Sequence, residues 1–481
     1  MPLRHVTDRV VATARAPGAR SRSSKGLVAA LALALGACAG APPTASLAVR
    51  ADRVIDDAVT GHGLSGAFVL MRDGRVVHER AVGLAQRDPD RPFTVDTPSD
   101  GGSMAKTLTA AALWELAADG RVSLDDAVTR HLPEYPYAGQ TLRDLLTHRS
   151  GLPDYGLFEP ELRARSELHT PDLLRLTAQR QPQPRRPPGV RVEYANLGFD
   201  AAALVVERVT GQPIARWWQQ RYFTPLGLDG MFARPARFAD FPVPRTVGYR
   251  RDADGRWQPF DAFDGEGFVG GSNVHASARA WARWGDAFAR GRVMAPERLQ
   301  RGLREAMFVS GLPEALTMLS WYCDAPRRRC HYSGQYKAFY AHVWWDRERR
   351  EVVAWVGNSL LPPWHCEQIT RDLVDVLAGR DPAPERTPAP LALPRAQRAA
   401  LAGDYRSPTL GALQWTAHDG GATLRVGEGE AASAFAVDRG TFYVPTLGLW
   451  LRFSGTPDAP TLHLRSMFGT AEATREAAPR R

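Results

Sequence analysis

The sequence predicts an α+β or mixed α/β fold, followed by a small all-β domain at the C-terminal end. Strand-like runs stand at both ends of residues 48–380 and enclose a long helical region, so the terminal strands are expected to share one sheet. Five prolines within residues 381–395 predict a semi-rigid linker. Short apolar runs separated by turn sequences then fill residues 396–481. A chain of 481 residues is long enough for two or three domains.

The elements of the first domain follow from local patterns. Two apolar runs, 65–72 and 75–83, flank Asp73-Gly74, which is a turn sequence typical of a β-hairpin. Apolar periodicity predicts helices in the middle of the domain, and runs rich in Val, Phe and Trp predict strands near its end. The expected helices include 103–118, 197–209 and 277–289, and the later strands are 338–345 and 351–356.

The C-terminal region consists of paired short runs with turn residues between them. This pattern predicts antiparallel hairpins, and therefore a small β-barrel or sandwich over residues 396–481. The pairs are 413–418 with 422–426, 434–437 with 441–444, and 449–453 with 461–466.

Residues 1–37 have the pattern of a signal peptide. They hold six positive side chains and one negative, and their apolar run, 27–37, is shorter than the roughly 20 residues that span a bilayer. Leu35-Gly36-Ala37-Cys38 resembles the lipobox of bacterial lipoproteins, so lipidation of Cys38 is expected on a short tether, residues 38–47. The alternatives are a plain signal peptide with an incidental cysteine, or an uncleaved anchor extending through Leu47. The preferred interpretation predicts an exported protein of the cell envelope or periplasm, held at the membrane by a lipid anchor.

Charge and cysteine spacing exclude two classes of function. The formal net charge is +9, but the leader supplies much of it, and no basic stripe interleaved with aromatic residues follows, so nucleic-acid binding is not expected. No Cys or His cluster has the spacing of a zinc site, and neither a metal nor another cofactor is expected. Cys323 and Cys330 bracket a turn-like hexapeptide, so in an oxidising envelope they are expected to close a hairpin with a disulfide, the alternative being two thiols; Cys366 is left over.

Ser103 stands at the start of a predicted helix. Gly101 and Gly102 precede it, and Asp119-Gly120 ends the helix. Backbone N–H groups and the positive end of the helix dipole stabilise a developing oxyanion at such a position. Lys106 lies three residues further, on the same helix face. A serine hydroxyl is a weak nucleophile that needs a neighbouring base, and a lysine that gives up its proton is such a base.

The lysine content of the chain supports a special role for Lys106. The chain has three lysines, Lys25, Lys106 and Lys337, and all its other positive side chains are arginine. Arginine does not deprotonate in proteins, so a chain that otherwise uses arginine is expected to place Lys106 where titration is required. The alternative is a solvated surface lysine beside a capping serine.

A second motif, Tyr194-Ala195-Asn196, adds a proton shuttle and an amide that can hold a substrate. By itself it is better explained by a core tyrosine and a helix-capping asparagine. Together with Ser103-x-x-Lys106, it resembles the serine β-lactamase and penicillin-binding protein superfamily, in the class C-like branch that includes D-aminopeptidases, DD-carboxypeptidases and esterases. The resemblance covers roughly residues 50–380 and implies a β-lactamase-like α+β fold, in which helices flank an antiparallel β-sheet. Further matching segments are 141–154, 209–213, 225–228 and 270–276, the last with Val274 and His275 in place of Ser and Thr.

The resemblance implies a third motif, Lys-Thr-Gly or His-x-Gly, on a strand that lines the pocket. The best match is Tyr332-Ser333-Gly334, where Tyr replaces the usual Lys or His. His331 is expected to face away, because side chains alternate along a strand. The resemblance also implies an oxyanion hole made of the Ser103 and Gln335 backbone N–H groups.

The missing cation in the third motif counts against carboxylate-bearing substrates. Lys337 replaces that cation only if the strand bulges or ends early, and an exposed lysine is expected instead.

His148 and His365 are expected to be structural. No Gly-x-Ser-x-Gly elbow is present, which disfavours an α/β-hydrolase triad.

These features predict a serine hydrolase that forms an acyl-enzyme on Ser103 and cleaves a small ester, or a D-amino-acid amide or peptide. Lys106 or Tyr194 is expected to take the serine proton, Tyr194 to protonate the leaving group, and Asn196 to orient the substrate. The partner is thus a small-molecule or peptide substrate. One alternative is a β-lactamase or DD-carboxypeptidase acting on a β-lactam or a peptidoglycan peptide; another is an envelope-binding lipoprotein without turnover.

Overall fold

The computed structural model describes most of the chain from residue 45 onward. The described residues are 45–181, 183–185, 187–190, 193–307, 315–324, 328–361, 363–382, 390–408, 410–419, 421–427, 431–444, 449–456, 459–465 and 470–476. The predicted signal peptide, Cys38 with most of the tether, and the middle of the predicted linker lie outside these residues.

An eight-stranded antiparallel sheet forms the framework of the first domain. Its order, β12-β13-β14-β15-β16-β17-β1-β2, brings strands from both ends of the domain side by side. β1 pairs with β17, with Gly66 opposite Gly357, so the terminal strands do share one sheet, as predicted. The strands are β1 (Gly66–Arg72), β2 (Arg75–Val82), β12 (Ala306–Met307), β13 (Ala315–Thr317), β14 (Tyr322–Cys323), β15 (Arg329–Tyr336), β16 (Phe339–Asp346) and β17 (Glu351–Gly357).

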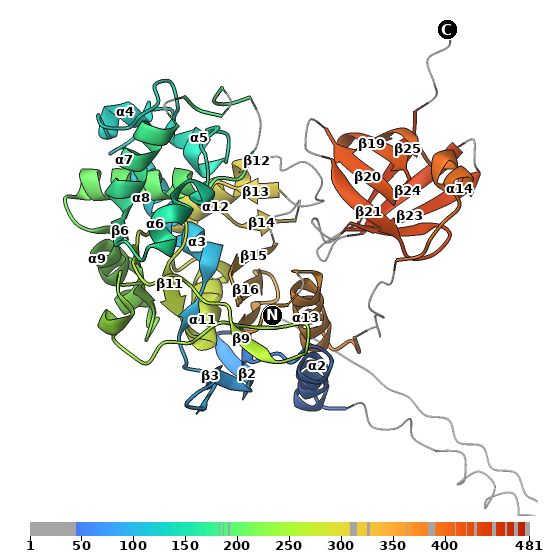
Figure 1. The fold of residues 1–481 in the computed structure, drawn as a ribbon, viewed down its shortest axis with the longest axis horizontal. Coiled ribbons are helices and arrows are strands. Elements are labelled where there is room, and N and C mark those ends of the chain that lie inside the picture. Colours follow the sequence, from blue (N-terminus) through green and yellow to red (C-terminus); the bar gives the residue numbers. More distant parts are fainter. Residues whose placement is uncertain are drawn as a thin grey trace, which may run out of the picture. The chain divides into compact units, whose positions relative to one another are not determined.

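Helices cover both faces of this sheet. Side chains alternate along a strand, so Phe68 of β1 packs with α2 (Leu47–His62) and α13 (Pro363–Leu377), whereas Val69 packs with the larger helical region on the opposite face. Figure 1 shows the sheet between these two layers. Because both faces are covered, the central strands β16 and β17 are buried along their whole length, and the predicted α+β, β-lactamase-like fold is confirmed.

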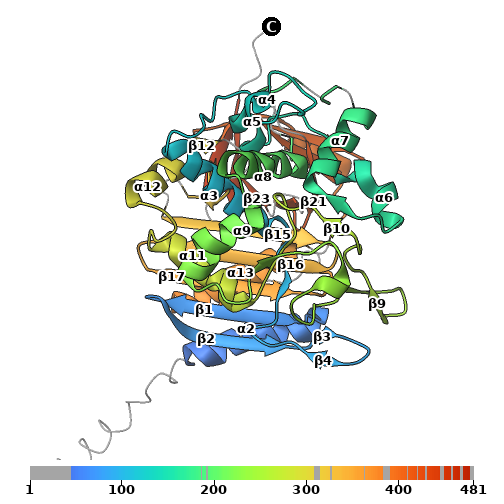
Figure 2. The same cartoon turned by 90° about the vertical axis from the view of Figure 1, so that its left-hand side faces the viewer.

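The larger helical region lies between β2 and β12 in the sequence. α11 packs across β1, β16 and β17, as Figure 2 shows, and α8 packs beside α3. Its helices are α3 (Ala105–Ala118), α4 (Val128–His131), α5 (Leu142–Leu146), α6 (Glu159–Arg163), α7 (Thr170–Arg180), α8 (Asn196–Thr210), α9 (Ile214–Trp218), α10 (Thr224–Leu226), α11 (Ala278–Ala289) and α12 (Pro296–Arg304), with the short helices η1 (Gly102–Met104), η2 (Tyr155–Phe158), η3 (Gln219–Phe223) and η4 (Phe238–Asp240).

Small sheets connect these helices to the rest of the domain. One of them joins the segment before Ser103 to the segment after Gly271, because β5 and β7 pair on either side of β11. The strands are β5 (Ser99–Asp100), β7 (Phe232–Ala233) and β11 (Val274–Ala276), with the pairs β3 (Leu84–Gln86) and β4 (Arg91–Pro92), β6 (Leu168–His169) and β10 (Glu266–Gly267), and β8 (Tyr249–Arg251) and β9 (Trp257–Pro259).

The C-terminal domain is a closed eight-stranded barrel, which decides between the two predicted all-β architectures. β18 pairs with β25 to close it, with Tyr405 opposite Arg475. Buried aromatic side chains, among them Trp415, Phe442 and Phe453, fill its interior. Helix α14 (Arg395–Ala400) precedes the strands β18 (Gly403–Ser407), β19 (Gly411–His418), β20 (Gly421–Val426), β21 (Ala432–Ala436), β22 (Thr441–Val444), β23 (Leu449–Thr456), β24 (Ala459–Arg465) and β25 (Thr470–Arg475).

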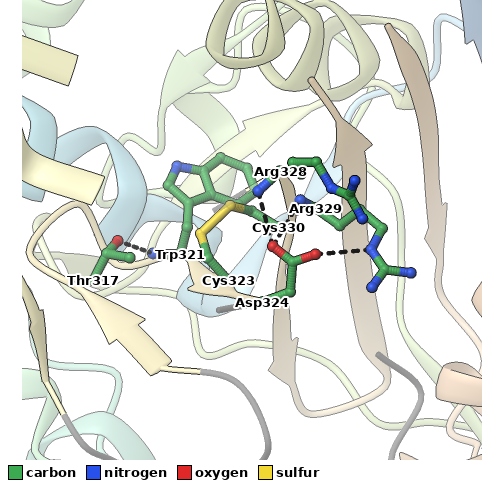
Figure 3. Close-up of a disulfide and its surroundings, with 7 residues drawn as sticks. All are labelled: Thr317, Trp321, Cys323, Asp324, Arg328, Arg329 and Cys330. Atoms are coloured by element: carbon green, nitrogen blue, oxygen red, sulfur yellow. Dashed lines mark hydrogen bonds and ion pairs between the residues drawn. A yellow bond between two sulfur atoms is a disulfide. The ribbon is translucent and has the colours of Figure 1, made fainter. Parts of the chain in front are cut away.

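A disulfide joins Cys323 of β14 to Cys330 of β15, and the two residues stand opposite each other in the sheet (Figure 3). Asp324 supports the same hairpin, because its carboxylate accepts from the Arg328 backbone N–H at 2.8 Å and from Arg329 Nε at 2.9 Å. These links fix the start of β15, the strand that carries the predicted third motif. Cys366 is buried and is not disulfide-bonded. Within the described part of the chain, no helix has the length and apolar character to cross a membrane.

Candidate active site

Ser103 follows a tight turn between β5 and α3. The N–H of Gly101 donates to the Val274 carbonyl at 2.9 Å, and that of Gly102 donates to Asp100 Oδ1 at 2.8 Å. Gly102 has φ of +50°, and a Cβ at this position would lie 2.8 Å from the backbone nitrogen of Gln335. Glycine is therefore required for the turn to approach β15. The turn places Ser103 in η1, directly before α3.

Lys106 is completely buried behind Ser103. All of its hydrogen bonds run to oxygen atoms that carry no full charge. Its Nζ donates to Ser103 Oγ at 3.1 Å, to Asn196 Oδ1 at 2.5 Å and to Gly271 O at 2.6 Å. Three acceptors match the three hydrogens of an ammonium group, so the site holds Lys106 in one orientation, aimed at the serine oxygen.

Tyr194 lies on the solvent side of Ser103. Its Oη is 2.6 Å from Ser103 Oγ, and 46% of the residue is exposed. The ring stacks on His148 with centroids 4.3 Å apart. The Nδ1 atom of His148 accepts from the Ala195 N–H at 3.3 Å, and burial, with a smaller contribution from Lys106, lowers the pKa of His148 to about 3. His148 is thus a neutral support for Tyr194, which agrees with its expected structural role.

Asn196 begins α8 and bridges Lys106 to a carboxylate. Its Oδ1 accepts from Lys106, and its Nδ2 donates to Asp154 Oδ1 at 2.9 Å. Both ends of the side-chain amide are therefore used within the protein. In this arrangement Asn196 orients Lys106, whereas the sequence motif predicted a contact with the substrate.

The third motif lies on β15, beside the turn that carries Ser103. A Cβ added to Gly334 would lie 2.7 Å from the Ser103 nitrogen, so the strand and the turn are in direct contact. Tyr332 faces the same side as Gly334, is 3% exposed and lies beside Tyr194. Burial, and then the neighbouring phenols of Tyr194 and Tyr322, raise the pKa of Tyr332 well above its ordinary value. Tyr332 is thus a neutral partner where the superfamily motif has a cation.

The chain matches the β-lactamase family over residues 51–376. The chain belongs to the β-lactamase family. This match confirms the predicted superfamily and, with it, the class of enzyme: a β-lactamase-related serine hydrolase.

Individual relatives of this β-lactamase family member include esterases and peptidases. Esterase EstB of Burkholderia gladioli is 36% identical over 215 residues, which are 40% of this chain and 54% of EstB. A D-aminopeptidase of Cereibacter sphaeroides is 30% identical over 231 residues, which are 47% of this chain and 43% of the relative. This chain thus spans about half the length of these two curated relatives.

Among solved structures, the octameric penicillin-binding protein homologue from Pyrococcus abyssi has a similar fold. The TM-score is 0.62 at 19% sequence identity, and the match covers 89% of this chain and 99% of the other. At this level of identity the similarity describes the fold, and it agrees with the β-lactamase-like architecture derived above.

Some residues from the sequence analysis lie away from the serine. Ser333 is on the opposite face of β15 from Tyr332, on the side of Tyr340. The backbone of Gln335, and not its side chain, approaches the Gly102 turn. Lys337 lies in the turn after β15 with φ of +52°, and its Nζ is 4.3 Å from the centroid of the Phe263 ring. The turn therefore directs this lysine to an aromatic surface.

Three further histidines have buried surroundings. His331 stacks on Tyr322, with centroids 5.5 Å apart. His365 lies against His62, at 3.5 Å between centroids, and burial lowers its pKa to about 4. His275, which replaces a threonine of the superfamily motif, packs between Phe232 and Phe241, and burial lowers its pKa well below the ordinary value.

Sequence reasoning assigned no role to two carboxylates, Asp154 and Asp200. Asp154 belongs to a segment that resembles the superfamily, but its bond to Asn196 depends on how distant segments pack. Asp200 follows Asn196 by four residues on α8, and residues at this spacing share a helix face. This spacing was the signal available in the sequence. The described residues contain no group of three side chains that could hold a metal ion.

Proposed function

We propose that this chain is a serine hydrolase that forms an acyl-enzyme on Ser103 and cleaves a small ester or a D-amino-acid amide. One observation carries the proposal: Ser103 Oγ lies between Tyr194 Oη at 2.6 Å and Lys106 Nζ at 3.1 Å. Both groups are within the distance at which a side chain removes or supplies a proton.

The contacts of Lys106 favour it as the base. Its two shorter bonds run to the carbonyl oxygens of Asn196 and Gly271, which only accept. A neutral amine has two hydrogens and one lone pair. When Lys106 is neutral, these two carbonyls take both hydrogens, and the lone pair is left facing the third neighbour, Ser103 Oγ.

The reaction then follows from the positions of the groups. Ser103 Oγ attacks the substrate carbonyl carbon while its proton moves to Lys106, and the carbonyl oxygen becomes an oxyanion facing the N–H groups of Ser103 and Gln335. The bond to the leaving group breaks, and the proton passes by way of Tyr194 to the departing alcohol or amine. Water then attacks the serine ester by the reverse set of transfers, which releases the acid and restores Ser103.

The substrate class rests on Tyr332. A buried neutral phenol offers a hydrogen bond but no positive charge, so it gains little from a substrate carboxylate. An ester or an amide without a nearby carboxylate therefore fits this site better than a β-lactam or a peptide ending in D-alanine. The similarity to an esterase and to a D-aminopeptidase supports the same choice.

A second serine–histidine–carboxylate chain lies on the outer wall of the barrel. Ser454 Oγ is 2.7 Å from His463 Nε2, and His463 Nδ1 is 3.0 Å from Glu472 Oε1. The side chains of His463 and Glu472 are 39% and 70% exposed. An exposed chain of this kind lacks the water-excluded surroundings that strengthen catalysis, and it provides a control for the assay.

The experiment compares wild type, Ser103→Ala and Ser454→Ala on a nitrophenyl ester, a D-alanyl amide and nitrocefin. We expect ester or amide turnover that Ser103→Ala abolishes and Ser454→Ala leaves unchanged. Turnover that survives Ser103→Ala contradicts the proposed nucleophile. Nitrocefin hydrolysis faster than both other reactions contradicts the proposed substrate class.

We also propose that the protein is exported and anchored by lipid on Cys38. The basic leader with its apolar run supports export, and the disulfide between Cys323 and Cys330 fits an oxidising compartment. Metabolic labelling with a radioactive fatty acid tests the anchor. Label is expected on the wild type and not on Cys38→Ala, and equal labelling of both contradicts lipidation at this residue.

A further inference from the structure

Lys106 has no carboxylate among its direct hydrogen-bond partners, although it is completely buried. A buried ammonium without a nearby anion is strongly unfavourable. Two of its acceptors, however, are each held by a carboxylate. Asp154 bonds to Asn196, and Asp200 bonds to the Gly271 peptide.

Asp200 reaches the catalytic lysine through a single residue, Gly271. It is fully buried on α8, and its Oδ1 accepts from the Gly271 N–H at 2.8 Å. The carbonyl of the same residue accepts from Lys106 Nζ at 2.6 Å. Asp200 Oδ2 accepts from Tyr155 Oη at 2.7 Å. Both carboxylate oxygens therefore accept a hydrogen bond. The donor to Oδ1 is Gly271, the residue whose carbonyl contacts the catalytic lysine.

The Gly271 peptide has little room to move. A Cβ on Gly271 would lie 2.8 Å from the Asn196 carbonyl oxygen and 3.1 Å from Tyr155 Oη. A Cβ on Gly270 would lie 2.8 Å from the Cα of Asp200. This pair of glycines therefore packs directly on the first turns of α8, and the Asp200 bond fixes its orientation.

The titratable groups around Asp200 come from several segments. Burial is the main cause that raises the pKa of Asp200 to about 6; the Gly271 N–H, Tyr155 and Lys106 act to lower it, and Asp154 acts to raise it. The pKa of Tyr155 is raised well above its ordinary value, mainly by burial and then by Asp200. His148, whose pKa is lowered to about 3, is neutral. At neutral pH, Asp200 is therefore an anion in the same buried region as Lys106.

We propose that Asp200 is a positioning residue of this active site, which holds the Gly271 carbonyl against Lys106 and supplies the buried negative charge that sets the pH at which Lys106 becomes a base. This inference rests on the proposed function, in which Lys106 takes the Ser103 proton. Asp200 touches neither the substrate nor the serine, and it acts through the Gly271 peptide and through its charge.

The test is the pH profile of Ser103 acylation in Asp200→Asn, measured as the burst of nitrophenol from a nitrophenyl ester. The asparagine Oδ1 still accepts from the Gly271 N–H and its Nδ2 donates to Tyr155, so the variant removes the charge and keeps the shape. We expect the acid limb of the profile to move to lower pH by about one unit, because an ammonium without its anion loses a proton more readily.

Glu207→Gln is the matched control. Glu207 lies on the same helix, is half-buried and accepts from the Ile214 N–H at 2.8 Å. Its profile is expected to coincide with that of the wild type. If Asp200→Asn does not fold, as judged by circular dichroism, Tyr155→Phe takes its place. Tyr155→Phe removes a donor that stabilises the Asp200 anion, so it shifts the limb in the same direction by a smaller amount.

The outcomes separate this inference from the proposed function. Suppose that the wild type gives a burst and that the Asp200→Asn or Tyr155→Phe variant is folded. If the acid limb of the variant then coincides with that of the wild type, the proposed role of Asp200 is contradicted. A wild type without any Ser103-dependent burst contradicts the proposed function itself.

Discussion

At the scale of single residues, the proposed site depends on a lysine, because a lysine side chain is able to release a proton and an arginine side chain is not. Lys106 is buried among two carbonyl acceptors and Ser103 Oγ, whereas Lys337 lies over the ring of Phe263. In the proposed mechanism the first position holds the base that takes the Ser103 proton, whereas the second has no part in the reaction. Two lysines in an arginine-rich chain thus have different physical reasons for being there.

Lys106→Arg keeps the charge and removes the base. The guanidinium stays protonated at any usable pH, so we expect the rate of Ser103 acylation to fall by about 1,000-fold, within the range for loss of a general base. Burst kinetics with a nitrophenyl ester measure the rate. Lys337→Arg is the control, with an expected rate close to wild type. A Lys106→Arg rate within a few-fold of wild type contradicts the assignment of Lys106 as the base.

The proposed preference for uncharged substrates rests on Tyr332. In Tyr332→Lys, a cation returns to the position it has in the superfamily motif, so we expect the rate on nitrocefin relative to a neutral ester to rise by about tenfold. Tyr332→Phe lacks both the cation and the hydroxyl, and its ratio is expected to stay near that of the wild type. An unchanged ratio in a folded Tyr332→Lys variant shows that this position does not select against carboxylates.

Residue spacing alone indicated the four residues that the structure brings together, but not the carboxylates that support them. Ser103 and Lys106 share one helix face, and Tyr194 and Asn196 stand at the start of another helix, so local patterns contained the necessary signal. Asp154 becomes relevant only when its loop packs against Asn196. Ser333 was expected near the substrate, but the alternation of β15 turns its side chain to the other face.

At the scale of elements, the site depends on how closely β15 approaches the turn before α3. Gly102 on the turn and Gly334 on the strand both lack a Cβ at this contact. The two backbone N–H groups assigned to the oxyanion come one from each side of it. The Cys323–Cys330 disulfide fixes β15 at its other end.

Gly334→Ala tests this contact. Its new Cβ would lie 2.7 Å from the Ser103 nitrogen, so the strand and the turn have to separate. We expect acylation to slow by about 100- to 1,000-fold, as for the loss of an oxyanion donor. Gly61→Ala on α2, whose Cβ meets nothing within 4 Å, is expected to react like wild type. If Gly334→Ala acylates at the wild-type rate, the two N–H groups do not form the oxyanion hole.

Local sequence patterns predicted many of these elements, because each pattern acts over a few residues. The Asp73-Gly74 hairpin and the helices after Ser103 and Tyr194 are found where the sequence places them. The short strands β5 and β11 were missed, since two- and three-residue strands carry no periodicity. Local patterns did not decide between a barrel and a sandwich, because closure of the barrel depends on the pairing of Tyr405 with Arg475, which are far apart in the sequence.

At the scale of the whole molecule, buried histidines govern the response to acid. Burial is the first cause that lowers the pKa of each of these side chains, which are His62, His148, His275, His331, His342 and His365. In the unfolded chain they bind protons near pH 6.5, whereas in the folded protein they stay neutral. Asp100 and Asp200 act in the opposite direction, because burial raises the pKa of each to about 6.

We therefore expect the free energy of unfolding to fall as the pH decreases below about 6.5. Each extra proton bound by the unfolded chain contributes roughly 1.4 kcal/mol per pH unit. The six histidines outnumber Asp100 and Asp200, the two carboxyl groups whose pKa is raised to about 6. Burial also raises the pKa of Glu207, Asp261, Glu266 and Asp286, which oppose the histidines in the same direction. Urea unfolding at pH 7.5 and pH 5.5 measures the difference. Equal or greater stability at pH 5.5 contradicts this account of the buried histidines.

The central claim is that Ser103 forms a covalent acyl-enzyme. Intact-mass measurement after incubation with a fluorophosphonate and with a slow ester substrate tests it most directly. The account predicts one adduct on the wild type, mapped to Ser103 by peptide sequencing, the same adduct on Ser454→Ala, and none on Ser103→Ala. An adduct of equal yield on Ser103→Ala, or a wild type that turns over ester without any adduct on Ser103, would contradict it.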